Sequence, residues 1–138
     1  MNAIEKIAGI FSKFPGIGPR QSKRFVFFLL TKGNDFLDEL IGLLNKLKDE
    51  VLMCDSCYRF FPASPGKEKI CKICSDKNRD SSMLMLIEKD TDLENLEKSG
   101  IYKGYYFVLG GNISVFEKNP EEKIRAKELI KKIKWATK

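Results

Sequence analysis

The sequence predicts an α+β protein in several parts: a helical N-terminal region, a four-cysteine metal module and an α/β unit. Three observations support this order. Apolar residues in the first third of the chain recur every three or four positions, which is typical of helices. All four cysteines then fall into two C-x-x-C pairs. Beyond them, two short apolar runs flank an amphipathic segment, which favours the order strand, helix, strand.

Two helices and a tight turn are predicted for the first 32 residues. Residues 3–14 form a helix with one apolar face, made by Ile4, Ile7, Ala8, Phe11 and Phe14. Residues 15–19 read PGIGP, and this run of prolines and glycines ends the helix and favours a hairpin with exposed backbone amides. A second helix is predicted from Arg20 to Lys32, and its buried side is made by Phe25, Val26, Phe28 and Leu29.

This helix, hairpin and basic helix resemble a helix-hairpin-helix element, which binds the backbone of nucleic acids without reading their sequence. Glycine amides and the positive end of the second helix favour a phosphate oxygen, and basic side chains in the next turns can flank it. The predicted phosphate contacts are Gly16, Gly18, Arg20, Lys23 and Arg24. The alternative is an ordinary connection between two helices whose basic residues are simply solvated.

A third helix is predicted over residues 34–48. Acidic residues lie in its first turns and lysines in its last, which matches the helix dipole at both ends. Its apolar face is broader than a single stripe and contains Phe36, Leu37, Leu40, Ile41, Leu44 and Leu47. We expect these side chains in the core, and any part of the face left exposed would indicate dimerisation.

The cysteine quartet Cys54, Cys57, Cys71 and Cys74 predicts one structural Zn²⁺ per chain. Two C-x-x-C pairs separated by thirteen residues can aim four thiolates at one point and close a tetrahedron that leaves no position for water or substrate. Mixed Cys/His ligation is excluded because the chain has no histidine. Disulfides would need an oxidising compartment, and residues 1–10 lack the apolar stretch of a secretion signal; a redox C-x-x-C would not need a second copy.

The remainder of the chain predicts a parallel α/β unit. After a polar linker over residues 76–82, apolar runs at 83–87 and 105–109 have the length of buried strands. The amphipathic helix between them has three inner positions, which are Leu93, Leu96 and Ile101. Glu88 is expected at the carboxyl end of its strand, where such sheets place their sites. A final helix is predicted from residue 119 onward, with a solvated face that bears Lys127, Lys131, Lys132 and Lys134.

Composition and charge favour a globular protein with an anionic partner. The chain is 43% hydrophobic and 32% charged, and no apolar run has the length of a membrane span, so we expect a soluble, cytoplasmic protein. The formal charge is +6 and the pI is near 9.1. Residues 1–48 carry 8 basic against 4 acidic side chains, so the excess is concentrated where the hairpin is predicted.

Four motifs in this order resemble the family of the bacterial recombination mediator RecR, and together they span nearly the whole chain. They are FPGIGPR at 14–20, the cysteine quartet with CKICS at 71–75, LIE at 86–88 followed by Asp92, and YFVLGGNIS at 106–114. The family combines a helix-hairpin-helix, a four-cysteine zinc finger and a Toprim domain. The resemblance therefore implies a DNA-binding and dimerisation region over 1–53, a zinc finger over 54–75 and a partial Toprim domain over 80–138.

The resemblance also implies a function. Members of the family are not known as enzymes; they form ring-like oligomers and help partner proteins load recombinase onto gapped or single-stranded DNA during repair. By position, Arg20 and Arg24 match the family's DNA contacts, and the four cysteines match its metal ligands. Glu88 matches the first acidic position of the Toprim fold, and Asp92 the acidic loop that contacts a partner protein.

The sequence departs from the family in two places. The spacer between the cysteine pairs is longer, which lengthens a loop without changing the metal geometry. The chain ends at Lys138, where the family continues through a second acidic motif and a segment used in oligomer contacts. Of the Toprim catalytic set only Glu88 is then present, with Asp90 and Asp92 in a loop beside it, and a single carboxylate binds Mg²⁺ weakly. We therefore expect no enzymatic activity, and a dimer formed through the N-terminal helices.

Three functions stay open on the sequence alone. The first is a non-enzymatic mediator that contacts the phosphates of single- and double-stranded DNA. The second is an adaptor that holds partners through Glu88, Asp92 and the third helix, with DNA contact supplied by those partners. The third is a Mg²⁺-dependent nuclease or topoisomerase-like fragment. DNA binding at increasing salt separates the first two, and cleavage that is abolished by changing Glu88 would support the third.

Overall fold

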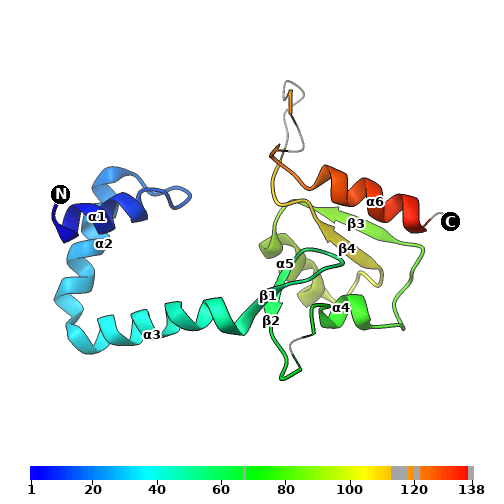
Figure 1. Cartoon of the computed structure of the whole chain (residues 1–138), viewed down its shortest axis with the longest axis horizontal. Coiled ribbons are helices and arrows are strands. Elements are labelled where there is room, and N and C mark those ends of the chain that lie inside the picture. The colour runs from blue at the N-terminus through cyan, green and yellow to red at the C-terminus, as the bar shows by residue number, and fades with distance from the viewer. Residues whose placement is uncertain (67, 113–117, 120–121, 137–138) are drawn as a thin grey trace. The chain divides into compact units, whose positions relative to one another are not determined.

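The computed structural model describes residues 1–66, 68–112, 118–119 and 122–136, and the chain divides into two compact units, Met1–Asp49 and Glu50–Lys138 (Figure 1). In the described residues the first unit is helical, and the second mixes strands with helices, so the predicted α+β class is confirmed. No helix in the described part of the chain is long and apolar enough to cross a bilayer.

Helix α1 (Ala3–Phe11) begins at a reciprocal cap and ends earlier than predicted. The side chain of Asn2 accepts a hydrogen bond from the Glu5 backbone N–H at 3.0 Å, and the Glu5 carboxylate accepts one from the Asn2 N–H at 3.2 Å. Ser12 ends the helix because its hydroxyl donates to the Gly9 carbonyl at 2.8 Å. The apolar face predicted to reach Phe14 therefore continues into the turn, where Phe14 packs edge-on against Phe11.

Helix α2 (Pro19–Lys32) starts as predicted, with proline at its first position. Gly16 has a φ of 74°, in the left-handed region that favours glycine, and this reverses the chain between the two helices. The buried side differs in part from the prediction: Val26 is 3% exposed, whereas Phe28 is 50% exposed. Phe28 instead lies edge-on against Phe36, with the Lys32 ammonium above its ring.

Helix α3 (Asn34–Glu50) contradicts the expectation that its apolar face lies in the core. None of its residues is buried, and the large apolar side chains of its face are between 37% and 57% exposed. They are Phe36, Ile41, Leu43, Leu44 and Leu47. Helices α1 and α2 pack against each other, while the ring contact between Phe28 and Phe36 joins α2 to the start of α3. The helix is thus amphipathic as the sequence predicts, but the large apolar side chains of its face remain exposed within the unit.

The second unit contains two small sheets in the described residues. Strands β1 (Val51–Met53) and β2 (Phe60–Pro62) are antiparallel. Strands β3 (Leu84–Ile87) and β4 (Tyr105–Val108) are parallel and are joined by helix α5 (Asp90–Ser99), which confirms the predicted strand, helix, strand unit. Helix α6 (Ala126–Ala136) follows β4, and it starts later than the predicted residue 119. Ile101, predicted to face inward, is 83% exposed because α5 ends before it, at the left-handed Gly100.

One hydrophobic cluster joins the cysteine module to the parallel sheet. It contains Cys54, Cys57, Phe61, Cys71, Ile73, Ile87, Leu93, Tyr106 and Val108. The backbone also connects the two parts, because the Val108 N–H donates to the Cys57 carbonyl at 2.8 Å and the Phe60 N–H donates to the Asp90 carboxylate at 2.7 Å. The module and the α/β segment therefore share a core.

Arg79, in the predicted polar linker, connects this segment to α5 and to the residue before β4. Its guanidinium donates to both carboxylate oxygens of Glu97, at 2.9 and 2.5 Å, and to the Gly104 carbonyl at 3.0 Å. The fully buried Tyr106 donates its hydroxyl to the same carboxylate at 2.7 Å. This network fixes α5 against the start of β4, and the sequence pattern contained no sign of it.

Replacing Glu97 by Gln removes the closer of the two charged partners of Arg79, the other being Asp76 at 3.8 Å, while it keeps the size of the side chain. We expect the free energy of unfolding at pH 7 to fall by about 1–3 kcal/mol, because a partly buried guanidinium loses a bidentate carboxylate. Urea unfolding followed by circular dichroism measures this change. The matched control is Glu94→Gln, which neutralises an exposed carboxylate of the same helix and should change stability by less than about 0.5 kcal/mol.

The same pair makes stability depend on pH. The pKa of Glu97 is lowered, chiefly because Arg79 donates hydrogen bonds to its carboxylate. A carboxyl group with a lowered pKa stabilises the fold above its unfolded pKa of about 4.3, and this contribution is lost as the pH falls through the folded pKa. The stability gap between wild type and E97Q should therefore shrink on acidification below about pH 4. A gap that stays constant down to pH 3 would contradict the assigned role.

Candidate metal centre

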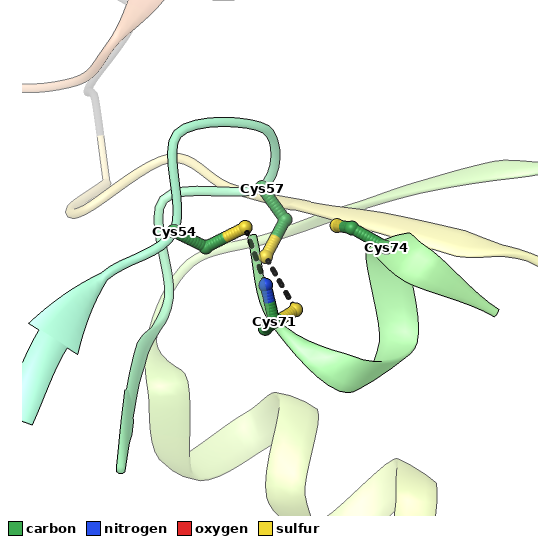
Figure 2. A group of neighbouring side chains, drawn as sticks. All are labelled: Cys54, Cys57, Cys71 and Cys74. Carbon is green, nitrogen blue, oxygen red and sulfur yellow. Dashed lines mark hydrogen bonds between the residues drawn. The ribbon is translucent and has the colours of Figure 1, made fainter. Parts of the chain in front are cut away.

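The four predicted ligands come from two short turns (Figure 2). Cys54 and Cys57 lie in a turn directly after β1, in which the Tyr58 N–H donates to the Cys54 carbonyl at 2.9 Å and the Cys54 N–H donates to the Arg59 carbonyl at 2.8 Å. Tyr58 completes this turn with a φ of 65°. Cys71 is the N-cap of the short helix α4 (Lys72–Ser75), and Cys74 projects from it toward the other three.

The sulfur atoms have the spacing that a tetrahedral metal requires. All four lie within 4.8 Å of one another, and the sulfurs of Cys57 and Cys71 are 3.7 Å apart. Four sulfurs bound at about 2.3 Å from a tetrahedral Zn²⁺ would be separated by about 3.8 Å. Cys54, Cys57 and Cys71 are at most 1% exposed, and Cys74 is partly exposed. The quartet is thus a candidate metal site whose donor set is consistent with zinc.

Protons and a cation compete for this cluster. The pKa of Cys71 is held far below its usual value, chiefly by hydrogen bonding from Cys54, and the pKa of Cys57 is raised far above it, chiefly by its bond to Cys54. The pKa of Cys54 falls to about 5, chiefly because Cys57 donates to its sulfur. Shared protons therefore stabilise some thiolates at the expense of others, whereas a bound cation would allow all four to be thiolates and would release protons.

Two cations beside the cluster were missed by sequence reasoning. Burial is the largest single influence on the pKa of Arg59 and would lower it, but the neighbouring thiolates of Cys71, Cys57 and Cys54 together outweigh burial and raise it. The ammonium of Lys132 donates to the carbonyl and hydroxyl oxygens of Ser56, at 2.9 and 3.1 Å, and lies 5.7 Å from the centre of the Phe107 ring. Four thiolates around a divalent ion carry net negative charge, which both cations offset.

These contacts correct one prediction. Lys132 does not belong to the solvated face of the last helix, because it is half-buried against the first cysteine turn, while Lys127 and Lys131 are exposed. Arg59 has a local cue, since it follows the second cysteine by two residues. Lys132 lies 76 residues from Ser56, and no local pattern indicates that contact.

The predicted DNA contacts lie at one end of the first unit. Arg20, Lys23 and Arg24 are exposed in the first two turns of α2. Gly18 is the N-cap of that helix and offers no side-chain cap, while Gly16 makes the preceding turn. The structure therefore brings together the five residues predicted to bind phosphate, and the contact itself stays a prediction.

The predicted acidic residues do not converge. Glu88 follows β3 and is half-buried, and its carbonyl accepts the Gly110 N–H at 3.1 Å. Asp90 and Asp92 lie in the first turn of α5 rather than in a loop, and the Asp90 carboxylate is engaged by the Phe60 N–H. Among the described residues, the cysteine quartet alone brings three or more cysteine or carboxylate side chains close enough to share a metal.

Removing a bound metal should expose the shared core. With the zinc-loaded chain we expect a strong chelator to abolish hydrogen-exchange protection over residues 54–74, and to reduce it in β4, because Val108 donates to Cys57 and both belong to one cluster. Hydrogen exchange read by mass spectrometry checks this. Helices α1 and α2 serve as the internal control, since they belong to the other unit. Unchanged protection over 54–74 after complete metal removal would refute the structural role.

Comparison with known proteins gives a domain for the C-terminal part of the chain and relatives for nearly its whole length. Residues 82–137 match the family model of the Toprim domain. The recombination protein RecR of Bdellovibrio bacteriovorus is 32% identical over 133 residues, which are 96% of this chain and 63% of that protein. RecR of Rickettsia canadensis is 34% identical over 94% of this chain and 62% of its own length. RecR of Bifidobacterium adolescentis is 31% identical over 96% of this chain and 64% of its own length.

The chain thus spans between 62% and 64% of the length of these three relatives. The similarity is not confined to one motif, because the aligned 133 residues are 96% of the chain. The Toprim match covers the parallel strands β3 and β4, and the cysteine cluster fits the zinc finger that the resemblance implied. Over nearly its whole length, the chain is therefore similar to RecR recombination proteins, and its C-terminal part is similar to a Toprim domain.

Proposed function

We propose that this protein is a non-enzymatic, DNA-binding recombination mediator that helps partner proteins load recombinase onto gapped or single-stranded DNA during repair. The relatives named above are recombination proteins. The observation that carries the proposal is the basic end of α2, where three exposed cations surround a helix start without a side-chain cap. A cytoplasmic location fits this role, because bacterial DNA lies there.

Backbone recognition of DNA follows from the start of α2. The first amides of a helix have no intrahelical partner, and Gly18 supplies no side chain to satisfy them, so they remain available to a phosphate oxygen. Arg20, Lys23 and Arg24 are exposed within two turns and supply the countercharge. Contacts of this kind position the protein on single- or double-stranded DNA without reading bases.

The metal has a structural role in this proposal. One Zn²⁺ per chain would be held by Cys54, Cys57, Cys71 and Cys74, which fill all four corners of the tetrahedron. With no corner left for water or substrate, the ion supplies cohesion to the core and no reaction. The cysteines belong to the same cluster as Leu93 and Tyr106 of the Toprim segment.

The acidic residues support interaction rather than catalysis. Phosphodiester chemistry in a Toprim site needs several carboxylates around Mg²⁺, and Glu88 and Asp92 do not form such a group with any described neighbour. Glu88 at the end of β3 and the exposed Asp92 at the start of α5 instead offer negative charge to a basic surface of a partner protein. The proposal thus keeps the partner-binding role that the adaptor alternative gave to these two residues.

The exposed face of α3 supports association of two chains. Five large apolar side chains, each between 37% and 57% exposed, lie on one helix, and isolated soluble domains seldom leave such a patch in water. A second copy of the same helix is the occupant that matches it in chemistry and length, and it produces the two-fold symmetry that most homodimers adopt. We therefore propose a dimer formed through the N-terminal units.

Changing Arg20 and Arg24 together to Ala should weaken binding to single- and double-stranded DNA alike, because both side chains are assigned to phosphates. The slope of log affinity against log salt should fall in magnitude by about 0.7–0.9 for each phosphate that the variant no longer neutralises. Fluorescence anisotropy with labelled DNA at several salt concentrations measures both effects. The matched control Lys127→Ala with Lys131→Ala removes the same charge from exposed positions of α6. Equal affinities for both double variants would refute the hairpin site.

Replacing Leu44 by Asp should shift the protein from dimer to monomer, because the change places a charge in the centre of the proposed interface. Sedimentation equilibrium or light scattering over a range of concentrations measures the mass. Lys48→Glu is the control, since it alters an exposed polar position near the end of the same helix. A wild-type chain that is monomeric at all concentrations would rule out the dimer without affecting the DNA site.

A further inference from the structure

The four proposed metal ligands differ in exposure: three are buried and the fourth is partly exposed. The side chains of Cys54, Cys57 and Cys71 are at most 1% exposed, whereas Cys74 is partly exposed. The difference follows from position: Cys74 lies in the last turn of α4, while the other three lie inside the shared hydrophobic cluster. A solute that reaches this cluster therefore meets Cys74 first.

A cleft of about 410 Å³ leads to Cys74, and we call it the Cys74 cleft. It lies between the segment that enters β3 and helix α6, within the second unit. Its lining mixes hydroxyl groups, apolar side chains and one cation, including Ser56, Ser81, Met83, Tyr105 and Lys132. A volume of this size admits a molecule of several heavy atoms, so molecules larger than water can reach Cys74.

Backbone hydrogen bonds also favour reaction at Cys74 over Cys54. The sulfur of Cys54 accepts the N–H groups of Ser56 and Cys71, each at 3.4 Å. Because N–H···S bonds withdraw electron density from a thiolate, they make Cys54 the poorer nucleophile. Cys57 and Cys71 differ from Cys74 in burial, since each is at most 1% exposed.

We propose that Cys74 is the modification site of this centre. It is the thiolate that reacts first with hydrogen peroxide and other small electrophiles, which reach it through the Cys74 cleft, and its modification releases the metal. The inference rests on the proposed structural Zn²⁺ and extends it, since it assigns a reactivity to one ligand of an otherwise inert site. Lys132 lines the same cleft and adds a positive charge to its wall.

The reaction with hydrogen peroxide balances without another reagent. A lone pair of the Cys74 sulfur attacks one peroxide oxygen, an S–O bond forms, the O–O bond breaks, and hydroxide leaves; the sulfur is oxidised by two electrons and the peroxide is reduced by two. The four sulfurs lie within 4.8 Å of one another, so a neighbouring thiolate can then attack the sulfenic sulfur of Cys74. This second step forms a disulfide and releases a second hydroxide. Two thiolates remain, which is too few to retain Zn²⁺.

The first experiment maps the reactive thiol in the zinc-loaded full chain. A brief, substoichiometric exposure to N-ethylmaleimide, quenched and followed by peptide mass spectrometry, should place the label of singly modified chains on Cys74. Hydrogen peroxide should release zinc, read with a chromogenic chelator, at the rate at which Cys74 enters a disulfide. First labels that fall on Cys54, Cys57 or Cys71, or equally on all four, would overturn the proposal.

A variant of the cleft tests the route without touching a ligand. Ser81→Trp places a large ring at the cleft wall and should slow labelling of Cys74 by roughly tenfold. Ser64→Trp is the matched control, because it adds the same side chain at a position that does not line the cleft. Equal labelling rates for both variants and wild type would show that the reagent does not pass through the cleft.

Metal content measured before the reagent is added distinguishes the two proposals. A folded chain that takes up no zinc refutes the proposed structural metal, and this inference falls with it. A chain with one zinc that is labelled first at a different cysteine keeps the metal centre and refutes only the role of Cys74. One zinc, first labelling at Cys74 and slower labelling in S81W support both.

Discussion

The constraint on which the second unit depends is that four sulfur atoms must occupy one small volume. Four thiolates repel one another, and four thiols would leave buried polar groups without good hydrogen-bond partners. A bound cation removes both costs and makes the arrangement favourable. Because the cysteines belong to the core, this constraint affects the whole second unit. Cys54 and Cys57 belong to the same cluster as Leu93 and Tyr106, and the β4 backbone donates to the cysteine turn. Metal binding and core packing therefore contribute together to the free energy of unfolding of the second unit.

Local patterns predicted much of this structure, and long-range contacts explain what they missed. The spacing of the cysteines and the apolar runs around α5 depend on nearby residues, so the quartet and the parallel strands were predictable. The ties from Arg79 to Glu97 and from Lys132 to Ser56 join positions that have no common period. For α3 the pattern correctly indicated an apolar face, but periodicity does not tell which surface, if any, covers it.

The proposed function divides the chemistry of the chain between its two units. Cationic side chains and uncapped amides of α2 suit a phosphate backbone, while the second unit combines a closed metal site with carboxylates that do not converge. Among the described residues, the carboxylates do not gather around a shared metal position, as phosphodiester chemistry in a Toprim site would require. The proposed openness of Cys74 adds a sensitivity to oxidants that a fully enclosed quartet would lack.

The uncovered face of α3 also has a consequence for the protein in the cell. Leu44 and Leu47 are each more than half exposed in a single chain, as is Ile41. Until such a surface is covered, chaperones and proteases that recognise exposed apolar segments compete for it. If two chains are needed to cover it, survival of a newly synthesised copy depends on how quickly it meets another, and cellular abundance would then rise more steeply than the rate of synthesis.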